Sequence, residues 1–302
     1  MTARGRVRSS FRSGVKRLAA RSGFDVAEAS IYSPVPRIPG PDDPIWSQEC
    51  SFSIETTAQI EFAETELRPF LEELPEGFDH ARDAGFSLWN GQYQAGDAES
   101  LYALIRYLKP GRILELGSGF STLVSAAACA ANASEGIPTN LTAVDPAPRT
   151  EITDAIEGIA GVEHRDSREL PMEQFKALER NDVLFIDTSH VVKLGSEVNW
   201  LVLEVLPNLA PGVWVHFHDV FLPYEYPRFL FELGGYFNEQ YLLQAFLTGN
   251  PDWEVKLALH ALHRRERSRL LALVPSVVKP PGFPSWVEPT PAAFWMRRRD
   301  PR

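Results

Sequence analysis

The sequence is poor in cysteine and has no long apolar run. Its two cysteines, Cys50 and Cys129, cannot build a disulfide framework and do not have the spacing of metal ligands. No stretch of about 20 residues is both apolar and free of charge, so no membrane span is predicted. The first residues also lack the continuous apolar core of a secretory signal. These absences favour a cytoplasmic protein.

An excess of basic residues is also absent. The 302 residues include 30 Lys and Arg against 40 Asp and Glu, which gives a formal net charge of -10 at pH 7. Binding to nucleic acid requires a concentrated basic face that replaces the counterions of the phosphates. We therefore expect a small-molecule ligand and no nucleic-acid partner.

The first 24 residues depart from this acidic average. All the charged residues before Asp25 are basic: Arg4, Arg6, Arg8, Arg12, Lys16, Arg17 and Arg21. Apolar residues recur among them at helical spacing, so the segment is either an amphipathic helix on an anionic membrane surface or a solvated tail. The predicted organisation is a basic segment with a proline-rich linker (1–45), a helical extension (46–92) and a main domain (93–302).

The main domain has the pattern of a doubly wound α/β sheet, because helical segments alternate with short apolar runs from Asp97 onward. We expect a Rossmann-like fold with seven mostly parallel strands, the last one antiparallel, and an N-terminal helical extension. Helices are predicted over 54–74, over 97–108 with Asp97 as cap, and around 238–247. Strands are predicted at 112–116, 141–145, near 162, and at 182–187, 213–219, 253–259 and 292–298.

A glycine turn follows the first predicted strand, in the stretch ILELGSGFSTL. Residues 115–121 have the pattern E-x-G-x-G-x-S, in which the glycines let the backbone approach a ligand and the next helix presents free N–H groups. A dinucleotide site would have a third glycine where Thr122 stands, so the pattern is against NAD. Asp145, at the end of the second strand, is placed to accept hydrogen bonds from both hydroxyls of a ribose.

With these motifs, the sequence from about Tyr93 to Arg298 resembles the class I S-adenosylmethionine-dependent methyltransferases, and among them those of sugar and secondary-metabolite pathways. It departs from their usual pattern at Ser121, where a third glycine is common. The resemblance implies S-adenosylmethionine as cofactor, with Asp166 as a candidate for its adenine amino group. The implied cofactor contacts are Tyr93, Glu115, Gly117, Ser118, Gly119, Ser121, Asp145, Asp166 and Asp187. The plainer alternative is that these glycines and acids only form turns and helix caps.

Polar residues also follow the fourth and fifth predicted strands: Asp187 and His190, then His218 and Asp219. Methyl transfer requires an acceptor atom in line with the methyl group and a group that takes its proton. Imidazole suits this near neutral pH, so His190 and His218 are the candidate catalytic residues. The strand-end carboxylates also resemble those that hold magnesium in metal-dependent O-methyltransferases, which makes Asp187, His218 and Asp219 candidate ligands of Mg²⁺ or another divalent cation. His216, inside the strand, is interpreted as a core residue.

The sequence thus predicts an enzyme that transfers a methyl group from S-adenosylmethionine to a hydroxyl of a sugar or another small metabolite. Two other classes stay open, an NAD-dependent oxidoreductase and a non-catalytic binding module on the same fold. A homo-oligomer and a peripheral membrane contact through residues 1–24 are also compatible with the sequence. At the strand ends, the alternative to catalysis is that the polar residues cap helices or order loops.

Overall fold

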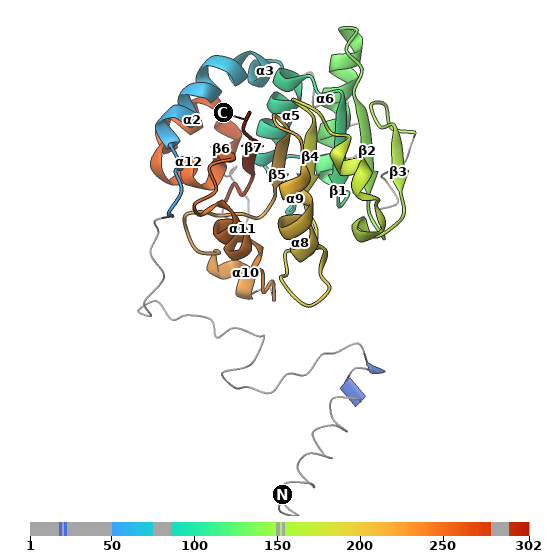
Figure 1. The fold of residues 1–302 in the computed structure, drawn as a ribbon. Helices are drawn as coiled ribbons and strands as arrows, with labels where there is room; N and C mark the ends of the chain where they lie inside the picture. Colours follow the sequence, from blue (N-terminus) through green and yellow to red (C-terminus); the bar gives the residue numbers. More distant parts are fainter. Residues whose placement is uncertain are drawn as a thin grey trace, which may run out of the picture. The chain divides into compact units, whose positions relative to one another are not determined.

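The computed structural model describes residues 18–19, 21–22, 50–74, 86–148, 152, 155–232, 234–278 and 290–301. The chain divides into two units, one of residues 46–227 with 237–302 and one of residues 1–45 with 228–236. The larger unit contains a seven-stranded sheet with strand order β3-β2-β1-β4-β5-β7-β6 (Figure 1). Its strands are β1 (Arg112–Leu116), β2 (Asn140–Val144), β3 (Gly161–Glu163), β4 (Val183–Ile186), β5 (Trp214–Phe217), β6 (Trp253–Ala258) and β7 (Phe294–Arg298).

Strands β1 to β5 are parallel, whereas β7 is antiparallel to both β5 and β6. This confirms the predicted fold, including the antiparallel last strand. Because the chain moves outward from β1 to β3 and then returns to β4 on the other side of β1, the connections reverse direction between β1 and β4. A ligand of such a sheet binds beyond the carboxyl ends of the strands at this reversal.

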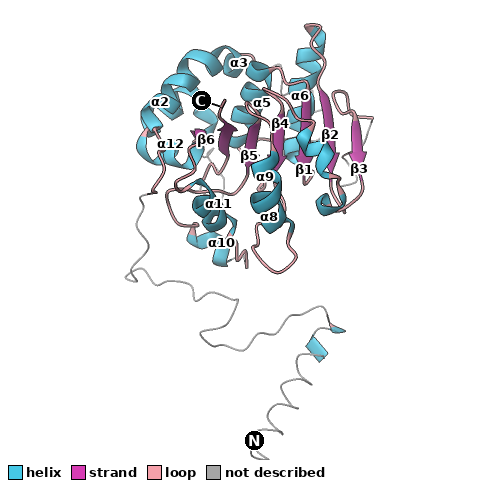
Figure 2. Cartoon of the chain, viewed as in Figure 1, coloured by secondary structure: helices cyan, strands magenta, loops and turns pink. Residues whose placement is uncertain are grey.

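Helices cover both faces of the sheet, as Figure 2 shows. In order along the larger unit they are α2 (Thr56–Phe62), the π-helix η1 (Ala63–Leu67), α3 (Arg68–Glu72), α5 (Asp97–Leu108), α6 (Phe120–Ser134), the 3₁₀-helix η2 (Ser167–Glu169), α7 (Met172–Lys176), α8 (Glu197–Trp200), the π-helix η3 (Leu201–Val205), α9 (Leu206–Asn208), α11 (Glu239–Leu247), α12 (Leu259–Arg265), α13 (Arg267–Leu273) and the 3₁₀-helix η4 (Pro275–Val277).

Alternate residues of the central strands belong to two separate cores. Val183 and Phe185 of β4 lie in one core with apolar residues of α5 and α6. Leu184 and Ile186 lie in the other, with residues of η3, α9 and α11. This alternation follows from the pleat of a strand, and burial on both faces explains why the parallel strands are continuous apolar runs in the sequence.

The helical extension covers the β6 edge of the sheet. Gln59 of α2 is buried, and its side chain accepts a hydrogen bond from Ala258 N (2.9 Å) and donates one to Val255 O (3.4 Å). An edge strand has unpaired backbone groups that can pair with another chain, and Gln59 satisfies some of these groups from within. The predicted helix over 54–74 is present as α2, η1 and α3 in succession, while the predicted domain boundaries at residues 45 and 92 stay predictions.

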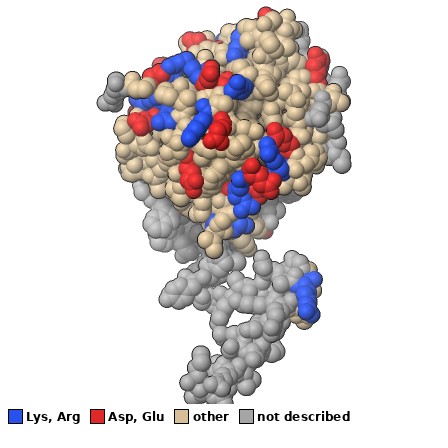
Figure 3. Space-filling model, turned by 45° about the vertical axis from the view of Figure 1, so that its right-hand side comes forward, with Lys and Arg blue, Asp and Glu red and all other residues tan. Residues whose placement is uncertain are grey.

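In the smaller unit the structure describes α10 (Arg228–Glu232), in which Arg228 Nε donates to Glu232 Oε1 at 2.8 Å. Apart from residues 18–19 and 21–22, the basic N-terminal segment and its linker lie outside the described residues, so a membrane contact stays a prediction. No helix within the described ranges is long and apolar enough to cross a membrane. On the face in Figure 3, basic and acidic side chains lie interspersed.

Candidate active site

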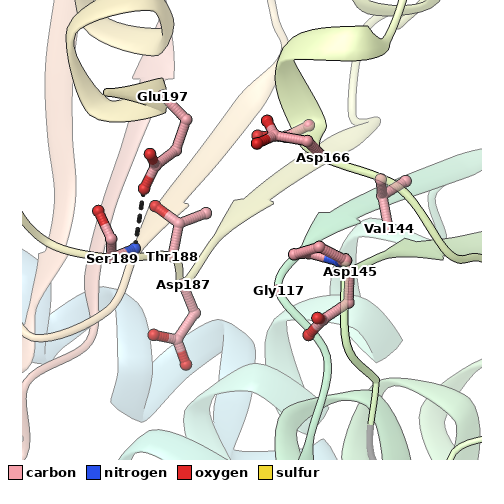
Figure 4. Close-up of a pocket in the computed structure, with 10 residues that line it drawn as sticks. Gly117, Val144, Asp145, Asp166, Asp187, Thr188, Ser189 and Glu197 are labelled. Carbon is pink, nitrogen blue, oxygen red and sulfur yellow. Dashed lines mark hydrogen bonds between the residues drawn. The ribbon is translucent and has the colours of Figure 1, made fainter. Parts of the chain in front are cut away.

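The glycine turn after β1 is in direct contact with the loop after β4. Gly117 has a φ of +86°, and a Cβ atom there would lie 1.9 Å from the backbone oxygen of Asp187. Its N–H donates to Val144 O at 2.9 Å, which also ties the turn to the end of β2. Only glycine combines this backbone conformation with this approach. The turn therefore brings together the ends of β1, β2 and β4, where Figure 4 shows Gly117, Asp145 and Asp187 around one cavity.

Asp145 orders the same turn through hydrogen bonds. Its Oδ2 accepts from the backbone N–H and the hydroxyl of Ser118 at 2.8 and 3.0 Å, and its Oδ1 accepts from Ala147 N at 2.8 Å. Each oxygen retains the capacity for a further hydrogen bond, because a carboxylate has about four acceptor positions. Asp145 is thus fixed in place at the cavity and can still accept from a ligand.

Gly119 differs from Gly117 because its backbone conformation does not require a glycine. Its φ of 175° is extended backbone that any residue adopts, and a Cβ atom added there would meet nothing within 4 Å. No contact with the described part of the chain calls for a glycine at this position. The space beside it suits a ligand that approaches the backbone closely, as the predicted cofactor site requires.

Glu115 is a buried acid directly behind the turn. Its Oε1 accepts hydrogen bonds from the hydroxyls of Ser121 (2.7 Å) and Thr122 (3.0 Å), whereas its buried Oε2 has no hydrogen-bond partner. Burial raises the pKa of Glu115 to about 8, against the opposing effect of these two hydrogen bonds. Glu115 and Ser121 thus lie one layer below the cavity lining, where they support the turn from behind.

The cavity at the reversal point has a volume of about 360 Å³. Its lining consists of Gly117, Val144, Asp145, Pro146, Asp166, Ser167, Asp187, Thr188, Ser189 and Glu197. Four of these residues are acids, and no Lys or Arg is among them, so the cavity favours a ligand with positive charge. S-Adenosylmethionine has such a charge on its sulfonium and its amino group.

Asp166 lies in the lining, but its carboxylate is already engaged. Oδ1 accepts from the backbone N–H and Nε of Arg168, both at 2.9 Å, and Oδ2 accepts from the same guanidinium at 2.5 Å. Through the backbone contact Asp166 caps η2, and the guanidinium holds its pKa below the usual value. Asp166 therefore caps a helix, and because it also lies in the cavity lining, its contact with the adenine stays a prediction.

Beside the cavity, two histidines alternate with two carboxylates in a ring. His190 Nε2 lies 3.1 Å from Asp187 Oδ1 and 3.7 Å from Asp219 Oδ2. His218 Nδ1 lies 3.7 Å from Asp187 Oδ2 and 3.7 Å from Asp219 Oδ1. Each carboxylate oxygen thus faces an imidazole nitrogen, and Asp187 belongs to both the ring and the cavity lining. The structure brings together the four polar residues predicted at the ends of β4 and β5.

A further carboxylate lies on the outer nitrogen of each histidine. Glu239 Oε2 is 3.0 Å from His190 Nδ1, and Asp97 Oδ2 is 3.5 Å from His218 Nε2. Glu239 is the first residue of α11 and Asp97 the first of α5, so the two acids come from opposite faces of the sheet. Both acids and both histidines are buried.

These contacts change the pKa values of the histidines. Burial alone lowers the pKa of His218, but the charges of Asp219 and Asp187 and the contact with Asp97 outweigh it and raise the pKa to about 9. For His190, hydrogen bonds with Asp187 and Glu239 likewise outweigh burial, and the pKa is well above its usual value. Burial raises the pKa of Asp187, but the charge of His218 and the hydrogen bond from His190 hold it well below the usual range.

Two aromatic residues, Tyr93 and His216, lie behind the ring. Tyr93, predicted as a cofactor contact, is buried with its ring 4.8 Å from that of His218, does not line the cavity, and its hydroxyl has no hydrogen-bond partner. His216 lies in the core as predicted, stacked on Phe185 at 4.2 Å, but neither of its nitrogens has a partner. Burial first, and then the charge of His218, lower its pKa well below the usual value, so His216 is neutral.

The predicted metal site is not formed by these residues. Among the described residues no group of three or more His, Cys, Asp or Glu side chains is arranged to hold a metal ion. The physical reason is the position of His190, whose Nε2 lies between Asp187 and Asp219 where a cation shared by the two carboxylates would be. The ligand set Asp187, His218 and Asp219 therefore does not fit a divalent ion in this arrangement.

Three acids of the site are outside the set of residues predicted for it, although the sequence allows Glu239 to face the acceptor from its helix. Glu239 and Asp97 are at helix starts, where an acid is expected for capping alone, so the sequence has no signal for their contacts with histidines. Glu197, the first residue of α8, lines the cavity and accepts from Ser189 N at 3.0 Å (Figure 4). Its proximity in sequence to the loop after β4 was the one available indication.

A family model covers the part of the chain that forms this site. Residues 114–220 match the family model described as a methyltransferase domain, a range that includes both the glycine turn and the His218–Asp219 pair. The matched part of the chain is therefore similar to a methyltransferase domain, and it contains strands β2, β3, β4 and β5 and most of β1. A search of curated proteins finds no match.

Solved structures show distant similarity. CmcI-N160 in its apo structure is 13% identical, with 71% of this chain and 77% of that chain covered and a TM-score of 0.39. The structure of CmcI-N160 with SAH is 15% identical, covers 71% and 83%, and has a TM-score of 0.38. The structure of a proposed methyltransferase from Thermobifida fusca YX is 13% identical, covers 81% and 88%, and has a TM-score of 0.30.

Proposed function

We propose that the enzyme transfers the methyl group of S-adenosylmethionine to a hydroxyl of a sugar or another small metabolite. The observation that carries this proposal is the position of Asp187, which belongs both to the cavity and to the buried ring of histidines and carboxylates. Because the two parts share this residue, a methyl donor in the cavity and an acceptor at the ring are neighbours. Such a juxtaposition meets the demand of an in-line displacement.

In this proposal the acidic cavity holds the cofactor. Asp145 accepts hydrogen bonds from the ribose hydroxyls, and the backbone beside Gly119 approaches the amino-acid part. Asp166, Ser167 and Glu197 line the remaining wall, toward the adenine. Asp187, whose low pKa keeps it ionised, would stabilise the positive charge of a bound sulfonium.

The ring of histidines and carboxylates takes the acceptor's proton. As the hydroxyl oxygen forms its bond to the methyl carbon, the bond from carbon to sulfur breaks, its electron pair remains on sulfur, and the hydroxyl proton passes to His190 or His218. An imidazole can accept this proton only in its neutral form. The raised pKa of both histidines keeps them protonated in the free enzyme, and the positive charge of the bound sulfonium counteracts this, because a nearby like charge lowers the pKa.

A hydroxyl suits this arrangement better than an amine does. An alcohol is a weak nucleophile that benefits from a base at the moment of attack, whereas a neutral amine attacks without one. Metal assistance is the competing way to activate a hydroxyl, and it would require His190 to leave the space between Asp187 and Asp219.

The experiment is a transfer assay with S-adenosyl-[methyl-³H]methionine and a metabolite extract, run with and without exhaustive chelation. We expect label in small molecules, unchanged by the chelator and abolished by Asp219→Asn. Asp252→Asn, at an exposed acid of the turn before β6, is the matched control and should retain full activity. Loss of transfer on chelation, restored by Mg²⁺, would replace the histidine mechanism with a metal mechanism. Absence of label in any small molecule would refute the proposed acceptor class.

We also propose that the enzyme works in the cytoplasm, since Cys50 and Cys129 are both free thiols, as a reducing compartment permits. The membrane contact of residues 1–24 can be tested by sedimentation of the full chain with anionic vesicles at low salt, where screening is weakest. A chain that lacks these residues is the control. Equal sedimentation of both chains would remove the membrane proposal.

A further inference from the structure

Two features of the molecule single out His190 over His218. The loop after β4 holds His190 in a left-handed backbone conformation, with a φ of +58°, which is uncommon outside glycine. Its carbonyl oxygen accepts hydrogen bonds from the backbone N–H groups of Asn238 (3.0 Å) and Glu239 (3.2 Å) at the start of α11. The Asn238 side chain also accepts from Val192 N at 2.5 Å. The beginning of α11 is therefore fastened to this loop at His190 and again two residues later.

The imidazole itself is held from the same helix. Glu239 Oε2 lies 3.0 Å from Nδ1, and the ring of Phe237 has its centroid 4.6 Å from that of the imidazole. On the opposite side, Nε2 faces Asp187 at 3.1 Å. Glu239 is only 1% exposed, so water does not compete for this contact. His218 is held less closely, because its Nε2 lies 3.5 Å from Asp97 Oδ2, whereas Nδ1 of His190 lies 3.0 Å from Glu239 Oε2.

We propose that Glu239 is a positioning residue that holds His190 as the base of the methyl transfer. A carboxylate on Nδ1 keeps a proton on that nitrogen, so the proton that His190 gives up and takes back is the one on Nε2, the nitrogen that faces Asp187 of the cavity lining. The ring then does not have to reorient before it takes the acceptor's proton. This inference rests on the proposed function, because it assigns the base within the same reaction.

The burial of Glu239 sets the choice of variants. Leucine at this position retains most of the side-chain volume but removes the acceptor, whereas glutamine retains an acceptor for Nδ1. In the transfer assay we expect Glu239→Leu to lower the rate by about 10- to 100-fold, as a misplaced catalytic group does. Glu239→Gln should recover most of that loss, and the dissociation constant of S-adenosylmethionine should stay within about twofold of the wild-type value in both variants, because Glu239 does not line the cavity.

A double-mutant cycle separates positioning from general damage to the fold. If Glu239 acts through His190, adding Glu239→Leu to His190→Ala should cause no further loss of rate, while adding it to His218→Ala should cause the full loss. Asp97→Asn at the other histidine retains an acceptor, as Glu239→Gln does, and should have a smaller effect than Glu239→Leu. Additive losses with His190→Ala, or a wild-type rate in Glu239→Leu, would overturn the proposal.

A second measurement does not depend on the acceptor. In the full-length wild-type protein labelled with ¹⁵N-histidine, one ring should show an Nδ1 proton that is protected from exchange, and His190→Gln should remove that signal. Glu239→Leu should also abolish the Nδ1 proton signal, whereas Glu239→Gln should retain it. If Nδ1 of His190 has no bound proton in the wild type, the positioning by Glu239 is refuted. If the wild type transfers no label but shows this signal, the proposed function fails while the contact stands, so the two failures are distinguishable.

Discussion

Replacing Glu115 by glutamine tests the electrostatics of the buried layer behind the glycine turn. Glu115 has a pKa of about 8 in the folded protein against 4.5 as its reference value, so the folded state binds its proton more tightly than the unfolded state does. Its contribution to stability is therefore present at low pH and is lost as the pH rises from 4.5 to 8. The slope in this window is about 1.4 kcal/mol per pH unit.

The magnitude follows from the two values. Between pH 5 and pH 8 the free energy of unfolding of the wild type should fall by about 3 to 4 kcal/mol relative to that of Glu115→Gln, which does not titrate. Glutamine retains the acceptor for Ser121 and Thr122 but places a donor at the buried position of Oε2, which costs about 1 to 3 kcal/mol at all pH values. The effect of Glu115 is given by the difference between the free energies of unfolding of the two proteins at each pH, because all other titrating groups contribute equally to both.

Urea unfolding of both proteins at several pH values measures this difference. Glu197→Gln is the control. Partial burial raises the pKa of Glu197, but hydrogen bonds, mainly from Ser189, outweigh it and lower the pKa. The contribution of Glu197 to the free energy of unfolding is therefore lost only as the pH falls below the carboxyl range. Its curve should run parallel to that of the wild type between pH 5 and pH 8. A Glu115→Gln curve that is also parallel would refute the raised pKa of Glu115.

Three further predictions concern the cavity and the ring. Asp145→Ala should weaken S-adenosylmethionine binding by about 1 to 3 kcal/mol in calorimetry, because charge-assisted hydrogen bonds to the ribose are lost, and an unchanged affinity in a folded variant would remove Asp145 from the site. Gly117→Ala should lower the melting temperature and the cofactor affinity together, because its Cβ would meet Asp187 O at 1.9 Å, and wild-type values for both would contradict the contact. The value of kcat/KM should continue to rise from pH 7 to about 9 instead of levelling off near 6.5, because the base must be a neutral imidazole. The pKa of His218 is about 9, and that of His190 is also raised. A plateau by pH 7 in a transfer assay would show that neither histidine is a base with a raised pKa.

The fold was predictable because its signals are local. Buried parallel strands are short apolar runs, and the structure has them at Arg112–Leu116 and Val183–Ile186, where the sequence predicted strands at 112–116 and 182–187. The ends of strands are harder to predict from sequence. Asp187 and His218 directly follow apolar runs and were included in the predicted strands, but the structure places them just beyond the strand ends. The helix from Asp97 was also predicted, with its end at Leu108.

The site was predictable only where it follows a strand. His190 and His218 were found because their loops come directly after β4 and β5. The partners of these histidines were not, because Glu239 is 49 residues from His190 along the chain and the acid at a helix start is explained locally. Asp97 was predicted as the cap of α5, but the structure has Gly96 at the cap position, and Asp97 instead accepts from Ala292 N and Ala293 N, across 195 and 196 residues.

These hydrogen bonds of Asp97 have a consequence for the order in which the protein matures. During synthesis the residues that line the cavity, from 117 to 197, leave the ribosome well before residues 290–301. Until Ala292 and Ala293 arrive, Asp97 has no backbone partners to hold it against His218, and β5 has no neighbour on its outer side. A nascent chain can therefore contain every residue of the cavity and of the ring while Asp97, the outer partner of His218, still lacks the backbone groups that fix it, so the last strand completes the support of the site.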